Sequence, residues 1–370
     1  MKIAFVNQDP GIAPGRAKGA AVHLEAMRRA FRALGHEVVC FDQPTTELLG
    51  TQLASSAHQR PFDLIYERYA LGATAASHFA HAGRVPHVLE VNAPLVAEAI
   101  AYRGLSDAQS LLDSERRLFR GASLLAAVSE EVAAYCRASS EAPVSVAVLP
   151  NGIDAEYFHL GRRENSRERA GIPSGRFVLG FHGRLRPWHA FETLACATAA
   201  LVSRGIDAHL LCVGRGDFEA ATRDATDGLL GSDRLTVQPW LPYEEVGAWI
   251  GAFDCLPLTY AKGGPHYFSP LKLREAMAVG AVPLVPRVGD LDRVVQHERT
   301  GLLFAAGDTR ELVEHLVRLA EEPVLCRRLS VAAAASAQEH TWQDNARTIL
   351  STLGLPVEVP KALPAGAPAG

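Results

Sequence analysis

Residues 177–185 read FVLGFHGRL, an uninterrupted apolar run that ends in a glycine and an arginine. A run without polar alternation is typical of a strand that is buried on both faces of a parallel sheet. The segment that follows, Ala190–Arg204, reads as a helix and leads to a second apolar run at His209–Val213. A strand, a helix and a strand in this order predict a parallel β-α-β unit.

The same alternation extends in both directions along the chain. In the second half we expect further strands at Leu235–Val237, Cys255–Leu258, Val282–Val285 and Leu302–Phe304, and helices at Leu271–Val279 and Arg310–Leu319. In the first half we expect strands at Lys2–Asn7, His36–Phe41, Phe62–Tyr66, His87–Val91 and Ser123–Val128. A helix over Ala20–Leu34 places its apolar residues on one face and ends at Gly35. The predicted fold class is therefore α/β, with two Rossmann-like parallel-sheet domains in tandem.

The chain has 370 residues, which is more than one ordinary hydrophobic core accommodates. The polar stretch GRRENSRERAGIPSGR at 161–176 divides the two runs of alternation and is interpreted as a linker with a short helix. We therefore expect one domain over residues 1–165 and a second over 166–340. A last helix is expected at about 341–356, and the Pro-, Ala- and Gly-rich tail over 357–370 is expected to be disordered.

Composition excludes several classes of protein. Hydrophobic residues at 48% and charged residues at 21% are the balance of a soluble globular enzyme. A formal net charge of −4 gives no indication of a nucleic-acid partner. No apolar run reaches the roughly 18–20 residues of a membrane-spanning helix, and the start of the chain reads as a strand rather than a signal peptide. We expect a cytoplasmic monomer or homodimer, with peripheral membrane contact left open.

No metal site is predicted. The six cysteines lie too far apart for a zinc knuckle or a CxxC redox pair. The one D-x-D sequence, Asp290-Leu291-Asp292, is interpreted as the capped start of a helix.

Candidate chemistry lies in the residues that follow the strands, because open parallel sheets bind ligands beyond the carboxyl ends of their strands. Gly183, Arg184 and Arg186 follow the strand at 177–181. Two guanidinium groups at this place match the oxygens of a diphosphate, although a solvated charged loop explains them equally well. Two further candidates follow the next two strands of this half, namely Gly214 and Trp240.

The densest group of unusual residues is KGGPHYFSPLKLREAMAVG at 262–280. Ser269 as the N-cap and Pro270 as the first helical residue predict a helix start whose backbone N–H groups are exposed to a ligand. Glu275 falls about one and a half turns later on a largely apolar helix, where a carboxylate needs a partner. That partner is a ligand or the backbone, unless Glu275 faces solvent and pairs with a basic neighbour such as Lys272.

In the first half, the loop Gly11–Gly19 ends where a helix starts, and the N–H groups of a helix start favour an anion. The loop lacks the glycine spacing of a dinucleotide fingerprint, and a connector without a ligand is an alternative. His23, one turn into the helix, is by itself better explained as a packing residue. The polar residues that follow two other strands are candidates for ligand contacts or for helix caps: Glu67, Arg68, Glu90 and Asn92.

Five short motifs occur in a fixed order: PNGID at 150–154, GRL at 183–185, VGRG at 213–216, SPLKLREAMAVG at 269–280 and TGLLF at 300–304. By their order and spacing the chain resembles the retaining GT-B glycosyltransferases of family four, the "group 1" glycosyltransferases. The resemblance covers nearly the whole chain and is strongest from about Leu149 to Ala306. It implies the GT-B fold, in which two Rossmann-like domains face a central cleft, and transfer of a sugar from a nucleotide diphosphate sugar.

The resemblance also implies roles for particular residues. Arg184 would neutralise the diphosphate, Glu275 would hold the ribose hydroxyls, and Trp240 would line the base. The remaining donor contacts would come from Gly19, Gly183, Arg186, Gly214, Ser269, Pro270 and Leu271. The acceptor would bind the N-terminal domain at Lys18, His23, Glu67, Arg68, Glu90 and Asn92. The last helix, from about Thr341, would cross back to that domain.

Two positions depart from the family pattern. Tyr267 stands eight residues before Glu275, where the family usually has a second glutamate. His189 stands five residues after Arg184, where the family tends to have a lysine. Arg186 or Lys272 would then supply the missing cation. The four candidates for a catalytic role are Arg184, His189, Lys272 and Glu275.

The predicted activity is transfer with retention of configuration, with UDP-sugars ranked first as donors and GDP-sugars next. Arginines and helix N-termini would stabilise the departing diphosphate without a metal ion or other cofactor. The Ala-, Arg- and Gly-rich composition indicates a bacterial source and hence envelope-glycan or natural-product biosynthesis. A GT-B nucleotide-sugar epimerase and a non-catalytic nucleotide-sugar-binding subunit are the alternatives, the second suggested by Tyr267 and His189.

Overall fold

The computed structural model describes residues 1–12, 19–42, 45–103, 108–260, 263, 267 and 269–358. The chain forms two compact units. The first unit comprises residues 1–151, 267–269 and 342–370, and the second comprises residues 152–266 and 270–341. Within the described ranges, no helix is both long enough and apolar enough to cross a bilayer.

The first unit contains a six-stranded sheet of order β2-β1-β3-β4-β5-β6, in which every pairing is parallel. Its strands are β1 (Lys2–Asn7), β2 (Glu37–Asp42), β3 (Leu64–Arg68), β4 (His87–Val91), β5 (Leu124–Ala127) and β6 (Val146–Val148). The five strands expected from the sequence are confirmed, with small shifts at their ends. The edge strand β6 was not predicted, although its three half-buried residues are apolar, because the strand is very short.

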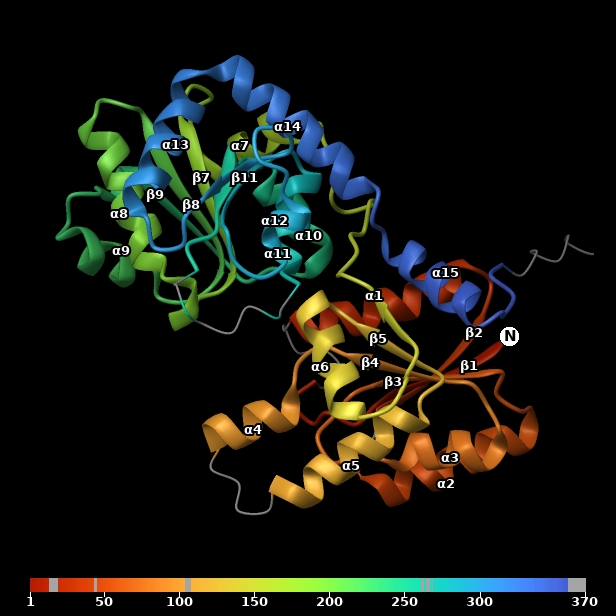
Figure 1. The fold of residues 1–370 in the computed structure, drawn as a ribbon. Coiled ribbons are helices and arrows are strands. Elements are labelled where there is room, and N and C mark those ends of the chain that lie inside the picture. Colours follow the sequence, from red (N-terminus) through yellow and green to blue (C-terminus); the bar gives the residue numbers. More distant parts are fainter. Residues whose placement is uncertain are drawn as a thin grey trace, which may run out of the picture. The chain divides into compact units, whose positions relative to one another are not determined.

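Helices cover both faces of this sheet (Figure 1). They are α1 (Gly19–Ala33), α2 (Thr46–Gln59), α3 (Ala75–Gly83), α4 (Leu95–Arg103), α5 (Ala108–Gly121), α6 (Glu130–Ser140) and α15 (Trp342–Thr352). Helices α2 and α3 pack on one face around Ile65, and α5 and α6 continue this layer around Leu125. Helices α1 and α15 lie against each other on the opposite face. The strand residues between the helical layers are therefore apolar on both sides, as their unbroken apolar runs predict.

The second unit has a parallel sheet of order β12-β11-β10-β7-β8-β9. Its strands are β7 (Phe177–Arg184), β8 (Ala208–Arg215), β9 (Leu235–Pro239), β10 (Cys255–Pro257), β11 (Val282–Pro286) and β12 (Leu302–Phe304). All six were expected from the sequence. Two parallel sheets, each connected through helices, confirm the predicted α/β class.

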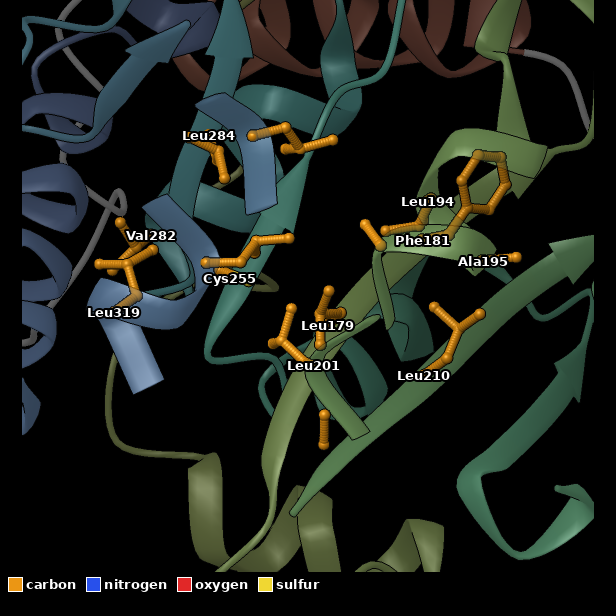
Figure 2. Packing of buried hydrophobic residues seen from close by; sticks show 14 of the residues in the cluster. Leu179, Phe181, Leu194, Ala195, Leu201, Leu210, Cys255, Val282, Leu284 and Leu319 are labelled. Carbon is orange, nitrogen blue, oxygen red and sulfur yellow. The ribbon is translucent and has the colours of Figure 1, made fainter. Parts of the chain in front are cut away.

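The helical elements of the second unit are α7 (Arg163–Ala170), η1 (Pro187–His189), α8 (Phe191–Ser203), α9 (Phe218–Thr226), η2 (Ser232–Arg234), α10 (Tyr243–Ile250), α11 (Leu271–Ala278), α12 (Leu291–Val294), α13 (Thr309–Glu321) and α14 (Pro323–Gln338). Residues of α8, α9, α13 and α14 pack on one face of the sheet in a single apolar cluster. Figure 2 shows Leu179 of the sheet beside Leu201 of α8, and Phe181 of the sheet beside Leu194 of α8. Burial of these side chains stabilises the unit by about 1.5–3 kcal/mol each.

The stretch at 161–176, which was expected to link the domains, belongs to the second unit. Along the chain, the boundary between the units falls between Asn151 and Gly152 rather than near residue 165. Helix α7 belongs to the second unit because two of its arginines bind a buried carboxylate there. Asp254, which precedes β10, accepts hydrogen bonds from Arg163 and Arg167 of α7. Its Oδ2 also accepts the backbone N–H of Val178 at 2.7 Å. These bonds hold α7 on the second unit.

The tail expected to be disordered from residue 357 is in contact with the first unit at its start. His36 Nε2 lies 3.1 Å from the carbonyl oxygen of Val357, and Arg347 donates to Glu358 at 3.4 Å. Residues 359–370 lie outside the described ranges.

Replacement of Asp254 by Ala would leave Arg163 and Arg167 without their shared acceptor. We expect a loss of about 3–5 kcal/mol from the unfolding free energy of the second unit, as for other broken buried ion pairs. Asp207→Ala is the control, because it removes an exposed carboxylate that pairs with Arg234 and should change stability by about 0–1 kcal/mol. Urea unfolding followed by tryptophan fluorescence measures both variants. Equal, small effects would show that Asp254 does not hold α7.

Candidate functional site

The strand order of the second unit reverses between β7 and β10, and ligands of such sheets bind beyond the carboxyl ends of the strands at this reversal. Gly183 and Arg184 at the end of β7 pair with Gly214 and Arg215 at the end of β8. Gly214 has a φ of 144°, and a Cβ atom there would lie 2.0 Å from the carbonyl oxygen of Gly183. The two strand ends therefore approach more closely than residues with side chains allow.

Three guanidinium groups are exposed at this edge of the sheet, those of Arg184, Arg186 and Arg215. Across the described parts of the chain, none of the three forms an ion pair. Arg186 lies 5.6 Å from the ring centroid of Trp188, and Arg215 lies 5.5 Å from that of Trp240. Unpaired guanidinium groups at one edge attract an anion that carries several charges. Sequence reasoning selected Arg184 and Arg186 but omitted Arg215, although Arg215 stands in the motif at 213–216.

Lys272 of α11 and His189 of η1 are in direct contact. Lys272 Nζ lies 3.1 Å from His189 Nε2 and 4.6 Å from the ring centroid of Phe181. Burial lowers the pKa of His189 to about 3, and the positive charges of Lys272 and Arg186 act in the same direction. The imidazole is therefore neutral, and its Nε2 accepts a hydrogen bond from the Lys272 ammonium group. Lys272 thus places an amino group beside His189, the position at which the family tends to have a lysine.

The ammonium group of Lys272 has an unusual environment. Burial lowers the pKa of Lys272 to about 7, although the charge of Glu275 opposes this effect. The loop that carries His189 is fixed by Thr259, whose Oγ1 donates to the carbonyl oxygens of His189 at 2.7 Å and Ala190 at 3.0 Å. An anion beside Lys272 would favour the charged form of the side chain.

Glu275 is only 5% exposed and lies on the face of α11 that meets the sheet. Its Oε2 is 2.9 Å from Nε2 of His182, a buried residue of β7. The alternative that Glu275 faces solvent and pairs with a basic neighbour is therefore wrong. His182 was not selected from the sequence, because a histidine inside an apolar strand gives no local sign of its partner.

The expected start of α11 needs a correction. The helix begins at Leu271, and Pro270 rather than Ser269 occupies the N-cap position. The Oγ of Ser269 accepts the backbone N–H of Asn151 at 3.0 Å, and the carbonyl oxygen of Ser269 accepts from the Asn151 side chain. The Ser269 hydroxyl group is therefore engaged by Asn151 instead of capping the helix.

Tyr267 belongs to the first unit and packs against the apolar cluster that contains Leu89 and Phe119. Its carbonyl oxygen accepts a hydrogen bond from Ser129 Oγ at 2.6 Å. The residue at the position of the expected second glutamate thus contributes to packing.

In the first unit, the Glu90 carboxylate is the centre of a buried polar cluster and is 2% exposed. Arg68 Nη1 donates to its Oε1 at 2.6 Å, and Tyr66 and Asn92 also donate to it. Burial alone would raise the pKa of Glu90, but His23 and Arg68 outweigh burial and hold this pKa well below its usual range. The structure therefore brings together His23, Arg68, Glu90 and Asn92 of the predicted residues and adds Tyr66.

His23 lies inside this cluster and is 4% exposed. Its Nε2 is 2.8 Å from Glu90 Oε2, and its Nδ1 is 2.6 Å from Asn151 Oδ1. The ring also meets Trp342 edge-on, with the ring centroids 4.7 Å apart. A cavity of about 10 Å³ beside His23 and Glu90 has room for about one water molecule. His23 is thus enclosed by protein atoms.

Three other predicted residues lie apart from this cluster. Glu67 is buried on the opposite face of the sheet, since strand residues alternate between faces, and its Oε2 lies 2.9 Å from His87 Nε2. Gly19 is the exposed first residue of α1. Lys18 lies outside the described residues.

Among the described side chains, no three or more His, Cys, Asp or Glu residues are arranged to hold a metal ion. Asp290 is the N-cap residue of α12, although its side chain makes no capping hydrogen bond, and Asp292 lies in the first turn.

Comparisons with known proteins identify the family and the fold of the chain. Residues 176–322 match the family model described as "Glycosyl transferases group 1", and residues 43–152 match "Glycosyl transferase 4-like domain". The D-inositol 3-phosphate glycosyltransferase of Arthrobacter sp. (strain FB24) is 26% identical, with 95% of this chain and 94% of that protein covered. The corresponding protein of Actinosynnema mirum is 29% identical over 57% of this chain and 52% of its own length.

Solved structures show the same fold. Anabaena HepE in complex with UDP has a TM-score of 0.73 and 22% identity, covering 96% of this chain and 100% of that chain. Sucrose-phosphate synthase from Thermosynechococcus elongatus has a TM-score of 0.71 and 19% identity, covering 95% and 98%. The two family matches together span more than two thirds of the chain. Because these matches and the two parallel sheets agree, the chain belongs to the group 1 glycosyltransferases of family four, which have the GT-B fold.

Proposed function

We propose that this glycosyltransferase moves a sugar from a nucleotide diphosphate sugar to an acceptor hydroxyl group with retention of configuration. UDP-sugars are the first choice of donor and GDP-sugars the second. The observation that carries the proposal is the group of cations at the ends of β7 and β8, formed by Arg184, Arg215 and Lys272. The structures of HepE in complex with UDP and with UDP-glucose support the same choice of donor.

The chemistry requires stabilisation of a leaving group. As the bond between the sugar C1 and the diphosphate oxygen breaks, its electron pair moves to the diphosphate, and the sugar gains oxocarbenium character. The acceptor hydroxyl attacks C1 from the same face and passes its proton to the departing phosphate oxygen. Arg184 and Lys272 would stabilise the charge on that oxygen without a metal ion, and the neutral His189 would hold the Lys272 ammonium group in place.

The other donor contacts follow from the same edge of the sheet. Glu275, which is held by His182, would accept hydrogen bonds from the ribose hydroxyl groups. Trp240, with Arg215 over its ring, would stack on the base. The first backbone N–H groups of α11, from Leu271 onward, would face the phosphates.

The acceptor would bind at the carboxyl ends of β3 and β4, where Arg68 and Asn92 meet Glu90. We propose an acceptor hydroxyl of an envelope glycan or of a natural product in a bacterium. His23 would act behind these residues rather than on the acceptor, because protein atoms enclose it.

Replacement of Glu275 by Gln tests the donor site. The loss of a charged acceptor for the ribose should weaken UDP-glucose binding about tenfold or more. The measurement is calorimetry in the presence of EDTA, with thermal unfolding as a check that the variant is folded. Glu192→Gln, an exposed carboxylate in the first turn of α8, is the control and should bind as the wild type does. Equal affinity in the Glu275 variant, or a requirement for metal, would count against this site.

The low pKa of Lys272 makes donor binding dependent on pH. The free protein has a pKa of about 7 at this residue, and a bound diphosphate would raise it by favouring the ammonium form. Affinity is therefore full below about pH 7 and falls as the pH rises toward the higher pKa of the complex, by roughly tenfold per pH unit at most. UDP-glucose is the suitable probe, because its diphosphate does not titrate in this range.

The matched variant for this measurement is Lys272→Arg, which keeps a positive charge throughout the range. Its affinity should stay flat between pH 6 and pH 9. A wild-type profile that is equally flat would mean that Lys272 does not meet the diphosphate.

A further inference from the structure

A continuous chain of polar contacts leads from the Glu90 cluster to the start of α11. Glu90 Oε2 lies 2.8 Å from His23 Nε2, and His23 Nδ1 lies 2.6 Å from Asn151 Oδ1. Asn151 in turn bonds Ser269 twice, through its backbone N–H and through its side-chain amide. All four residues belong to the first unit, and Ser269 is joined through Pro270 to the first helical residue of α11.

The orientation of the Asn151 amide group is determined by its partners. The carbonyl oxygen of Ser269 can only accept, so Asn151 must present Nδ2 to it and Oδ1 to His23. His23 Nδ1 must then carry a hydrogen and donate it to Asn151. The ring is therefore held in one orientation between the amide and the Glu90 carboxylate.

The same cluster anchors the points where the chain leaves and re-enters the first unit. Asn151 and Ser269 are each the last residue of the first unit before the chain enters the second. Trp342, the first residue after the return, packs edge-on against His23. Asn345 of α15 donates to the carbonyl oxygen of Pro150 at 2.8 Å. His23 is therefore linked to each of these connecting segments through one or two contacts.

We propose that His23 and Asn151 are positioning residues that couple the Glu90 cluster on the acceptor side to the start of the donor helix α11. The proposal rests on the proposed function for the meaning of the two sides. An acceptor hydroxyl that bonds Asn92 or Arg68 would redistribute the bonds that these side chains make to the Glu90 carboxylate. Because His23 faces the Glu90 carboxylate, this redistribution would alter the hydrogen bond from His23 to Asn151. The hydrogen bonds between Asn151 and Ser269 would change in turn. The burial of His23 is explained by this role, since a positioning residue needs no opening to the ligand.

The first test needs no ligand. Hydrogen exchange followed by mass spectrometry would be compared for wild type, Glu90→Gln and Glu115→Gln in the full chain, using a peptide that covers residues 269–278. Glu115 is the matched control, because it is also a buried carboxylate of the first unit and accepts from Tyr69 and Tyr135 without contacting His23. We expect exchange at the start of α11 to become roughly fivefold faster in Glu90→Gln only. Equal exchange in the two variants would overturn the proposal.

We call the chain of contacts from Glu90 through His23 and Asn151 to Ser269 the relay. A second variant distinguishes an effect of the relay from a general loss of packing. Asn151→Asp keeps the oxygen that faces His23 but removes the amide donor to Ser269. It should speed exchange over residues 269–278 as Glu90→Gln does, while exchange in β4 stays at the wild-type rate. Unchanged exchange over 269–278 in this variant would also contradict the relay.

The third measurement joins the relay to donor binding. Glu90→Gln should weaken UDP-glucose binding roughly fivefold in the wild-type background and have no effect in an Asn151→Ala background. An equal effect in both backgrounds would exclude coupling through Asn151. If the wild type binds no UDP-glucose, the proposed donor fails, and the exchange experiment still decides whether the relay exists.

Discussion

The contact between the Lys272 ammonium group and the neutral imidazole of His189 brings a cation to the edge of the second sheet. A half-buried ammonium group is unfavourable in the absence of an anion, because burial favours the neutral amine. Arg184 and Arg215 add to this excess of positive charge. The strand ends at Gly183 and Gly214 approach closely and leave no side chain between the cations and a ligand. These cations would attract an anion, and under the proposed function that anion is the diphosphate of the donor.

In the first unit, by contrast, the charged group at the carboxyl ends of the strands is already paired with protein groups. At the carboxyl ends of its strands lies the ionised and buried side chain of Glu90. This carboxylate accepts hydrogen bonds from Arg68, Tyr66 and Asn92. Its charge is therefore balanced before any ligand binds. The two units of the same fold class thus present different chemistry at the carboxyl ends of their strands.

Much of the fold and part of the site were predictable from the sequence. Apolar runs located eleven of the twelve strands, missing only the edge strand β6. The motif at 269–280 located α11, and the departures at positions 189 and 267 were visible without a structure. The domain boundary was wrong, because the charged residues of α7 looked like a linker while their partner Asp254 stands 91 residues from Arg163. The role of Ser269 as a helix cap was wrong for the same reason, since Asn151 lies 118 residues away.

The sequence by itself determined the parallel α/β architecture and the order of the family motifs, because both arise from patterns that repeat over short stretches of chain. Only the tertiary structure decided which side chains are partners. Lys272 meets His189 across 83 residues, Glu275 meets His182 across 93, and His23 meets Asn151 across 128. Such pairs depend on which strands are neighbours in the sheet and which helix lies over them, and hydrophobic periodicity does not carry that information.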